Sequence, residues 1–116
     1  MQIKYINKKA EKQFSSKYAR EWRYPPPVKE KLKAFENALQ NAETLNDIVC
    51  IPQYHFHKMK GSVRGEWSIY LGKKAGYRVT LIPCDEQGKY IKEGDILAVC
   101  KSIKIVEIME VSNHYE

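Results

Sequence analysis

The stretch "HKMKGSVRGEWSIYLGKKAGYRVTLIP", residues 57–83, contains two short segments rich in β-branched and aromatic residues. These segments, "EWSIYLG" and "YRVTLIP", are separated by "GKKAG", a glycine-punctuated connection that is typical of a β-hairpin. Gly61 and Gly65 bracket an earlier turn, so "HFHKMKG" at residues 55–61 reads as a preceding strand. The stretch therefore predicts an antiparallel meander.

The residues before this meander have helical patterns. "QIKYI" at residues 2–6 alternates as a strand does, and Asn7 is a suitable cap for a helix over residues 8–22. "YPPPVKEKLKAFENALQNA" places prolines at a helix entry, followed by apolar residues at helical spacing. These apolar residues are Val28, Leu32, Phe35 and Leu39. "TLNDIVCIPQY", residues 44–54, shows neither the helical nor the strand spacing of apolar residues. We expect it to be an irregular connection.

The pattern as a whole predicts an α+β fold in one domain spanning residues 1–116. A strand and helical half, residues 1–54, precedes a sheet half, residues 55–116, which ends in the strand "IKIVEIMEV". We expect two N-terminal helices packed on one face of a mostly antiparallel sheet of four to five strands, with the other face open. Residues 83–102 are expected to form an extended hairpin arm or a mobile loop.

The composition is that of an ordinary globular chain, and its net positive charge favours binding to polyanions. Twenty Lys and Arg residues against 14 Asp and Glu give a formal charge of +6, which favours encounters with nucleic acid or an acidic partner. Three cysteines without a CxxC pair predict neither disulfides nor a metal site. Because the sequence shows no signal peptide and no membrane span, we expect a cytoplasmic protein with no cofactor and no membrane partner.

Basic residues of the quoted stretch would gather on the open sheet face, next to aromatic side chains. Tyr70, Tyr77 and Tyr115 are available there, whereas Trp67 is expected in the core. Proteins usually bind single-stranded RNA with cations that hold its phosphates and with nearby aromatic rings that stack on its bases. Composition and spacing alone therefore predict only a basic α+β domain, for which RNA is one candidate ligand.

Four motifs in order also resemble a known family. "HKMKG", "GEWSIYL", "YRVTLIP" and the terminal "VEIMEVSNHY" are similar to the motifs of the HigB-like branch of the RelE/ParE superfamily of type II toxin–antitoxin toxins. The resemblance covers the C-terminal half well and the first half only in its order of elements. It implies a fold like that of the microbial ribonucleases and a toxin that cleaves mRNA, usually on the ribosome.

The resemblance also implies a metal-independent mechanism and a partner. The 2′-hydroxyl of RNA attacks its own phosphate with the help of a base, an acid and cations. Histidine suits the acid and base roles because it titrates near pH ~6.5, and arginine offers two donors to a phosphate. The implied partner is a cognate antitoxin, a helix-turn-helix protein from an adjacent gene, in a toxin–antitoxin hetero-oligomer. The implied catalytic residues are His57, Lys60, Arg78, His114 and Tyr115, and the implied RNA-binding residues are Arg64, Tyr70, Lys73 and Lys74.

Departures from the family pattern keep other functions open. Tyr70 stands where these toxins commonly carry a second arginine, and "SNHYE" shifts the terminal histidine by one position relative to the tyrosine. His55 lies off the motif and is expected to be structural or exposed. A ParE-like inhibitor of DNA gyrase and a non-catalytic RNA-binding module of the same fold are the alternatives.

Overall fold

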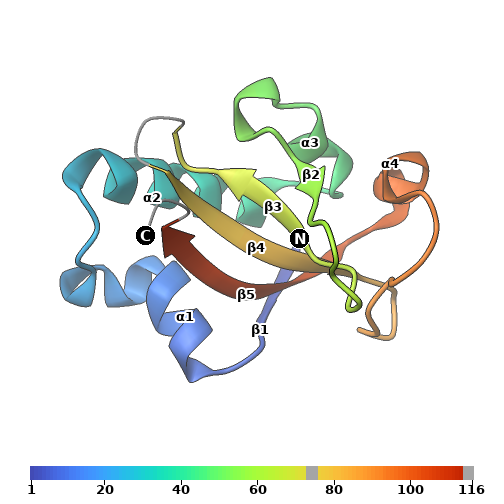
Figure 1. Cartoon of the computed structure of the whole chain (residues 1–116), viewed down its shortest axis with the longest axis horizontal. Coiled ribbons are helices and arrows are strands. Elements are labelled where there is room, and N and C mark those ends of the chain that lie inside the picture. The colour runs from blue at the N-terminus through green and yellow to red at the C-terminus, as the bar shows by residue number, and fades with distance from the viewer. Residues whose placement is uncertain (73–75, 114–116) are drawn as a thin grey trace.

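The computed structural model describes residues 1–72 and 76–113 and shows an α+β domain built on one open, mixed sheet (Figure 1). The strand order is β1-β5-β4-β3-β2. β1 pairs with β5 in parallel, and the other three pairings are antiparallel. The predicted fold class and antiparallel meander are therefore confirmed. The strands are β1 Gln2–Tyr5, β2 His57–Lys58, β3 Trp67–Tyr70, β4 Tyr77–Cys84 and β5 Ile105–Asn113.

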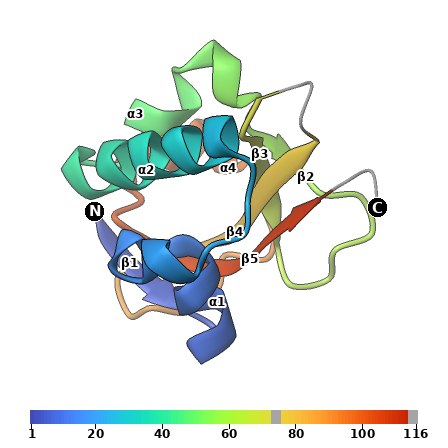
Figure 2. The same cartoon turned by 90° about the vertical axis from the view of Figure 1, so that its left-hand side faces the viewer.

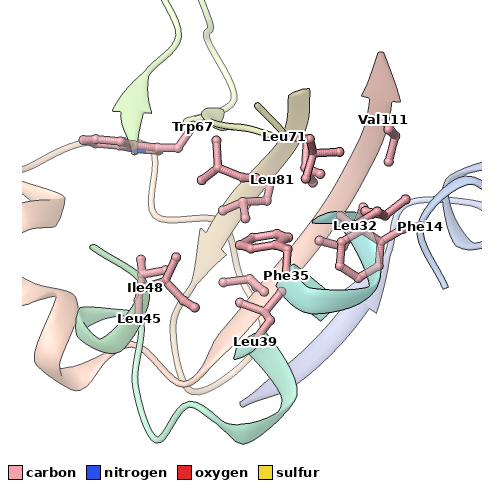
Figure 3. Packing of buried hydrophobic residues seen from close by; sticks show 14 of the residues in the cluster. Phe14, Leu32, Phe35, Leu39, Leu45, Ile48, Trp67, Leu71, Leu81 and Val111 are labelled. Atoms are coloured by element: carbon pink, nitrogen blue, oxygen red, sulfur yellow. The ribbon is translucent and has the colours of Figure 1, made fainter. Parts of the chain in front are cut away.

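The core lies between the sheet and helix α2, Pro26–Asn41 (Figure 3). Prolines begin this helix, where a missing backbone N–H costs nothing, and its four predicted apolar positions are all buried. Phe35 packs edge-on against Phe14, with ring centroids 6.0 Å apart. Trp67 is buried as predicted and stacks on Phe56 at 4.7 Å. Burial of this apolar stripe fixes α2 on one face of the sheet.

The predicted helix over residues 8–22 is wrong, because it is interrupted at Ser15. α1 spans Lys8–Phe14 and is followed by a 3₁₀ helix, η1, Ser16–Glu21. Ser15 has extended backbone angles, and its hydroxyl accepts a hydrogen bond from the Lys17 N–H at 3.3 Å. Serine competes with helical hydrogen bonding in this way, and it starts a new helix here. The buried carboxylate of Glu36 accepts from the Ser16 N–H and ties η1 to α2.

Two further segments are more regular than expected. Residues 44–54 contain a short helix, α3 Asn46–Val49, and a 3₁₀ turn, η2 Pro52–Tyr54. Residues 83–102 do not extend as an arm, because Ile96 and Cys100 of α4 (Ile96–Val99) and η3 (Cys100–Ser102) are buried in the core. Residues of α1, α2 and α3 enter the same core, so the helical layer beside the strands holds more than two helices (Figure 2).

The second face of the sheet is only partly open, which corrects the expectation of a free face. Thr80 and Ile82 point away from the helices yet are almost fully buried. The Thr80 hydroxyl contacts the Met59 sulfur at 3.6 Å, so the turn after β2 covers it. Tyr90, from the loop after β4, donates a short hydrogen bond to Glu107, which raises the pKa of Tyr90 to about 12. Two loops thus cover one part of this face, whereas His57, Tyr70 and Arg78 remain partly exposed.

Candidate functional site

The strand register brings the predicted strand residues together in two rows across the second face of the sheet. His57 lies opposite Ser68, which lies opposite Thr80 on β4. In the next row, Arg78 lies between Tyr70 of β3 and Ser112 of β5. Because directly opposed residues point to the same side of a sheet, these side chains share one surface. His57, Tyr70 and Arg78, which are far apart in the sequence, form one candidate site.

Three rings form a cluster at the edge of this surface. The His55 and Tyr70 rings are stacked, with centroids 5.3 Å apart and planes 2° from parallel. His57 lies 5.2 Å from His55 and 5.4 Å from Tyr70. Tyr70 therefore joins the two histidines to Arg78, its opposite partner on β4. His55, expected to be structural or exposed, is exposed and also belongs to this cluster.

The backbone at His55 orients the His57 ring. His55 adopts left-handed angles, with φ +46°, which are uncommon outside glycine, and its carbonyl oxygen lies 2.7 Å from His57 Nδ1. A carbonyl only accepts, so Nδ1 carries the proton and donates it. In the neutral ring the lone pair is then on Nε2. A lone pair at this position is what a general base requires.

Arg78 is unusual because part of its guanidinium group is buried without a partner. Its Nε has neither solvent contact nor a hydrogen bond, and in the described ranges Arg78 forms no ion pair. The hydroxyl oxygens of Ser68 and Ser112, in the same two rows, are also buried and unpartnered. Native proteins satisfy most buried polar groups, so three in one patch need an explanation. Because these three atoms have no accessible surface, a bound anion would contact the partly exposed remainder of Arg78 and could reach Nε only if the side chain moved.

The predicted cations Lys60 and Arg64 lie in the loop after β2 and not on a strand of the sheet. Lys60 is exposed in the turn that follows Met59, and it has no hydrogen bond or ion pair with another described residue. Arg64 is bound to Glu66 at 3.2 Å, so its charge is already partnered. The positive φ angles of Gly61 and Gly65, +78° and +85°, confirm the turn predicted there. The loop therefore supplies one free cation, Lys60, near the covered part of the face.

Several predicted residues lie outside the described ranges. They are Lys73, Lys74, His114 and Tyr115. Tyr77, which was offered as an RNA-binding aromatic, packs against Tyr24 at 5.4 Å on the core side. The candidate site is therefore built from His57, Tyr70 and Arg78, with His55 and the two serines.

Within residues 1–72 and 76–113, positive charge does not gather on this face. β5 brings Glu107 and Glu110 to it, and Glu107 forms an ion pair with Lys4 at 3.7 Å. Residues 7–23 contain six Lys and Arg residues against two Glu, a large share of the excess positive charge of the chain. Four of these cations line a groove beside α1: Lys8, Lys9, Lys12 and Arg23. Among the described residues, the expected basic concave surface on the sheet is thus a mixed surface, and a basic groove lies beside α1.

Sequence reasoning missed three participants: His55, Ser68 and Ser112. His55 precedes β2 and has left-handed backbone angles, so no strand period places it beside His57. Ser68 is two residues before Tyr70 on the same strand, so strand alternation was a signal for Ser68. Ser112 depends on the β4–β5 register, which shifts between Thr80 and Leu81, and no local pattern gives such a shift.

Comparison with protein-family models finds no match, and no curated protein is significantly similar in sequence. Within residues 1–72 and 76–113, no group of three or more His, Cys, Asp or Glu side chains is arranged to hold a metal ion. None of the helices in these ranges has the length and apolar content needed to cross a membrane. The function is therefore argued from the geometry of the site and from the motif resemblance.

Proposed function

We propose that the protein is the toxin of a type II toxin–antitoxin system, an endoribonuclease that cleaves mRNA on the ribosome without a metal ion. Two kinds of observation support this. The four motifs resemble HigB-like toxins, and three of them supply the residues that meet on one sheet face, His57, Tyr70 and Arg78. The placement of His57, Tyr70 and Arg78 on one face of the sheet by the strand register is the observation that carries the proposal.

In the proposed reaction the 2′-hydroxyl oxygen forms a bond to phosphorus, and the bond from phosphorus to the 5′-oxygen breaks. His57 Nε2 takes the proton of the 2′-hydroxyl. The hydrogen bond donated by Nδ1 leaves the lone pair of the neutral ring on Nε2. A second group, His114 or Tyr115, gives a proton to the 5′-oxygen. General base catalysis of this kind contributes about 10²–10⁴-fold in rate.

Arg78 would bind the charge that develops on the phosphate. Its planar guanidinium offers two parallel donors to phosphate oxygens, and a charge-assisted bond of this type is about twice as strong as a neutral one. Nε is already desolvated in the free protein. A phosphate would therefore bind the partly exposed remainder of the guanidinium group, and a bond to Nε would require a movement of the side chain. Lys60 would add a second positive charge from the turn after β2.

The proposed partners follow from the family resemblance. A helix-turn-helix antitoxin would neutralise the toxin in a hetero-oligomer, and the ribosome would present the message. The basic groove beside α1, on a different surface from the site, suits contact with RNA backbone by charge alone. This groove also favours the alternative of a non-catalytic RNA-binding module, because phosphate contacts made there need no acid or base.

Induced expression in bacteria separates the two functions. Wild-type protein should stop growth, and mapping of message 5′ ends within minutes should show new cuts. Arg78→Met keeps an unbranched stem that extends as far as the position of Nε but removes the phosphate donors, so both effects should disappear. Arg20→Met is the matched control, because Arg20 is exposed on η1 away from the site. RNA binding without arrest or cuts would support the binding module instead.

A further inference from the structure

His55 and His57 form a pair of imidazole rings at the edge of the sheet, just before and within β2. Their ring centroids lie 5.2 Å apart, with the ring planes at 46°. Two imidazoles bound to one tetrahedral zinc ion, each through a nitrogen about 2.0–2.1 Å from the metal, have centroids about 5 Å apart. The separation of the two rings therefore suits one divalent ion bound between them.

Each ring has a nitrogen lone pair that a metal ion can use. The His55 side chain is exposed and forms no hydrogen bond or ion pair with another residue in the described part of the chain. On His57, Nδ1 donates to the His55 carbonyl oxygen at 2.7 Å, so the lone pair of the neutral ring is on Nε2. Neutral imidazole is the form of histidine that binds metal ions. The pair thus offers two ligand atoms.

The two rings are already held as metal ligands are held. A histidine that binds a metal ion almost always donates its other ring N–H to a carbonyl, a carboxylate or water, which orients the ring. The Nδ1–H of His57 makes this bond to the carbonyl of the other proposed ligand, His55. The His55 ring in turn is stacked on Tyr70, with planes 2° from parallel. Because both rings are oriented before an ion arrives, less entropy is lost on binding.

The ligand set selects the class of ion. Imidazole suits Zn²⁺, Cu²⁺ and Ni²⁺, whereas Mg²⁺ and Ca²⁺ prefer oxygen ligands. In the part of the chain that the structure describes, no third His, Cys, Asp or Glu side chain joins the pair, so water completes the coordination. The positive charge of Arg78, opposite Tyr70, opposes a bound cation. The site therefore fits an exchangeable transition-metal ion and not a structural one.

We propose that His55 and His57 bind one divalent transition-metal ion and that this ion inhibits the protein. The ion would bind the Nε2 lone pair of His57, which is the lone pair that takes the proton of the 2′-hydroxyl in the proposed reaction. Inhibition rests on the proposed ribonuclease function, whereas metal binding does not. The ion is an inhibitor and not a cofactor. The three cysteines, which predict no metal site, take no part in it.

Isothermal titration calorimetry of the untagged protein with zinc, nickel and magnesium chlorides tests the binding. We expect one zinc or nickel ion per chain and no binding of magnesium at the same concentrations. Linking two binding groups raises affinity by about 10²–10⁴-fold over one group alone, so His55→Asn and His57→Gln should each lower the zinc affinity about 100-fold. Asparagine, like histidine, tolerates left-handed backbone angles, so His55→Asn suits the conformation of this position.

Two control variants identify the ligands. Lys58→Gln changes the exposed neighbour of His57 on β2, and Cys50→Ser removes an exposed thiol that can bind zinc by itself. Neither change should lower the zinc affinity, and urea denaturation checks that each variant is folded. Three results would overturn the proposal: loss of zinc binding in Cys50→Ser, full affinity in either histidine variant, or no zinc binding to wild type up to about 1 mM.

A cleavage assay separates this proposal from the proposed function. Purified protein, ribosomes and a message are incubated with and without zinc at constant magnesium, and each variant is compared with itself. Zinc at about ten times its dissociation constant leaves about a tenth of the wild-type protein free, so cleavage should fall about tenfold, and His55→Asn should be much less sensitive. Cleavage that bound zinc leaves unchanged or increases would refute the inhibition alone. Zinc binding that depends on both histidines, in a protein that cuts no message with or without zinc, would refute the ribonuclease function and its inhibition but keep the metal site.

Discussion

Replacing Arg78 by methionine should make the protein more stable while it removes activity. The buried Nε has no hydrogen bond, and an unsatisfied buried donor costs about 1–3 kcal/mol of folding free energy. Methionine has a stem of similar length without a donor, so the packing between Tyr70 and Ser112 is largely kept. We expect the free energy of unfolding to rise by about 1 kcal/mol. In a domain of this size, this raises the melting temperature by about 4 °C.

Urea denaturation followed by tryptophan fluorescence measures this change. Trp22 and Trp67 are both buried, with 6% and 8% exposure, so both report unfolding. Arg20→Met, in which an exposed arginine is changed, should leave the free energy of unfolding within about 0.5 kcal/mol of wild type. If Arg78→Met instead lowers the free energy of unfolding by 1 kcal/mol or more, Arg78 is a structural residue. The argument for a phosphate site would then fail.

Three further predictions concern the base and the two loops. In an induction assay, His57→Gln should reduce message cleavage by at least about 100-fold. Lys58→Ala, on the same short strand, should retain cleavage. Equal cleavage by the two variants would exclude His57 as the base. In urea denaturation, Gly65→Ala should destabilise the fold by about 2 kcal/mol more than Gly61→Ala. A Cβ at position 65 would lie 2.7 Å from the Ile91 carbonyl oxygen, whereas a Cβ at position 61 would have no neighbour within 4 Å. Equal losses would show that the two loops do not meet at Gly65. Because the pKa of Tyr90 is raised to about 12, the stability from its bond to Glu107 is complete below pH ~10 and is lost as pH rises through about 12. Tyr90→Phe lacks this hydroxyl, so its melting temperature should fall less steeply over this pH interval. An unchanged slope would contradict the hydrogen bond.

Most of the sheet follows from local sequence patterns. Alternating residues in "EWSIYLG" and "YRVTLIP" and the glycines between them predict β3, β4 and their antiparallel pairing. The prolines and the apolar spacing of residues 24–42 predict α2 equally well, because each signal acts within one or two turns of the chain. These elements fix the relative positions of Tyr70 and Arg78, so the centre of the site could be predicted.

The remaining features depend on contacts between distant parts of the chain. The break at Ser15 is stabilised from α2 by Glu36, which accepts from the N–H of Ser16, 20 residues earlier in the chain. The loop after β4 is held on the sheet by Tyr90 and Glu107, a pair 17 residues apart. The orientation of His57 depends on a left-handed conformation at His55, which is uncommon outside glycine. No local period reports such contacts, so the covered face and the histidine geometry had to come from the structure.

The most direct test of the central claim is the mapping of message 5′ ends after induction of the wild-type chain and of Arg78→Met. The account predicts new 5′ ends within minutes for wild type, growth arrest with them, and neither effect for Arg78→Met, although this variant is folded and at least as stable. Growth arrest without new 5′ ends, or identical cuts with both proteins, would contradict the claim that Arg78 holds the phosphate of a cleaved RNA.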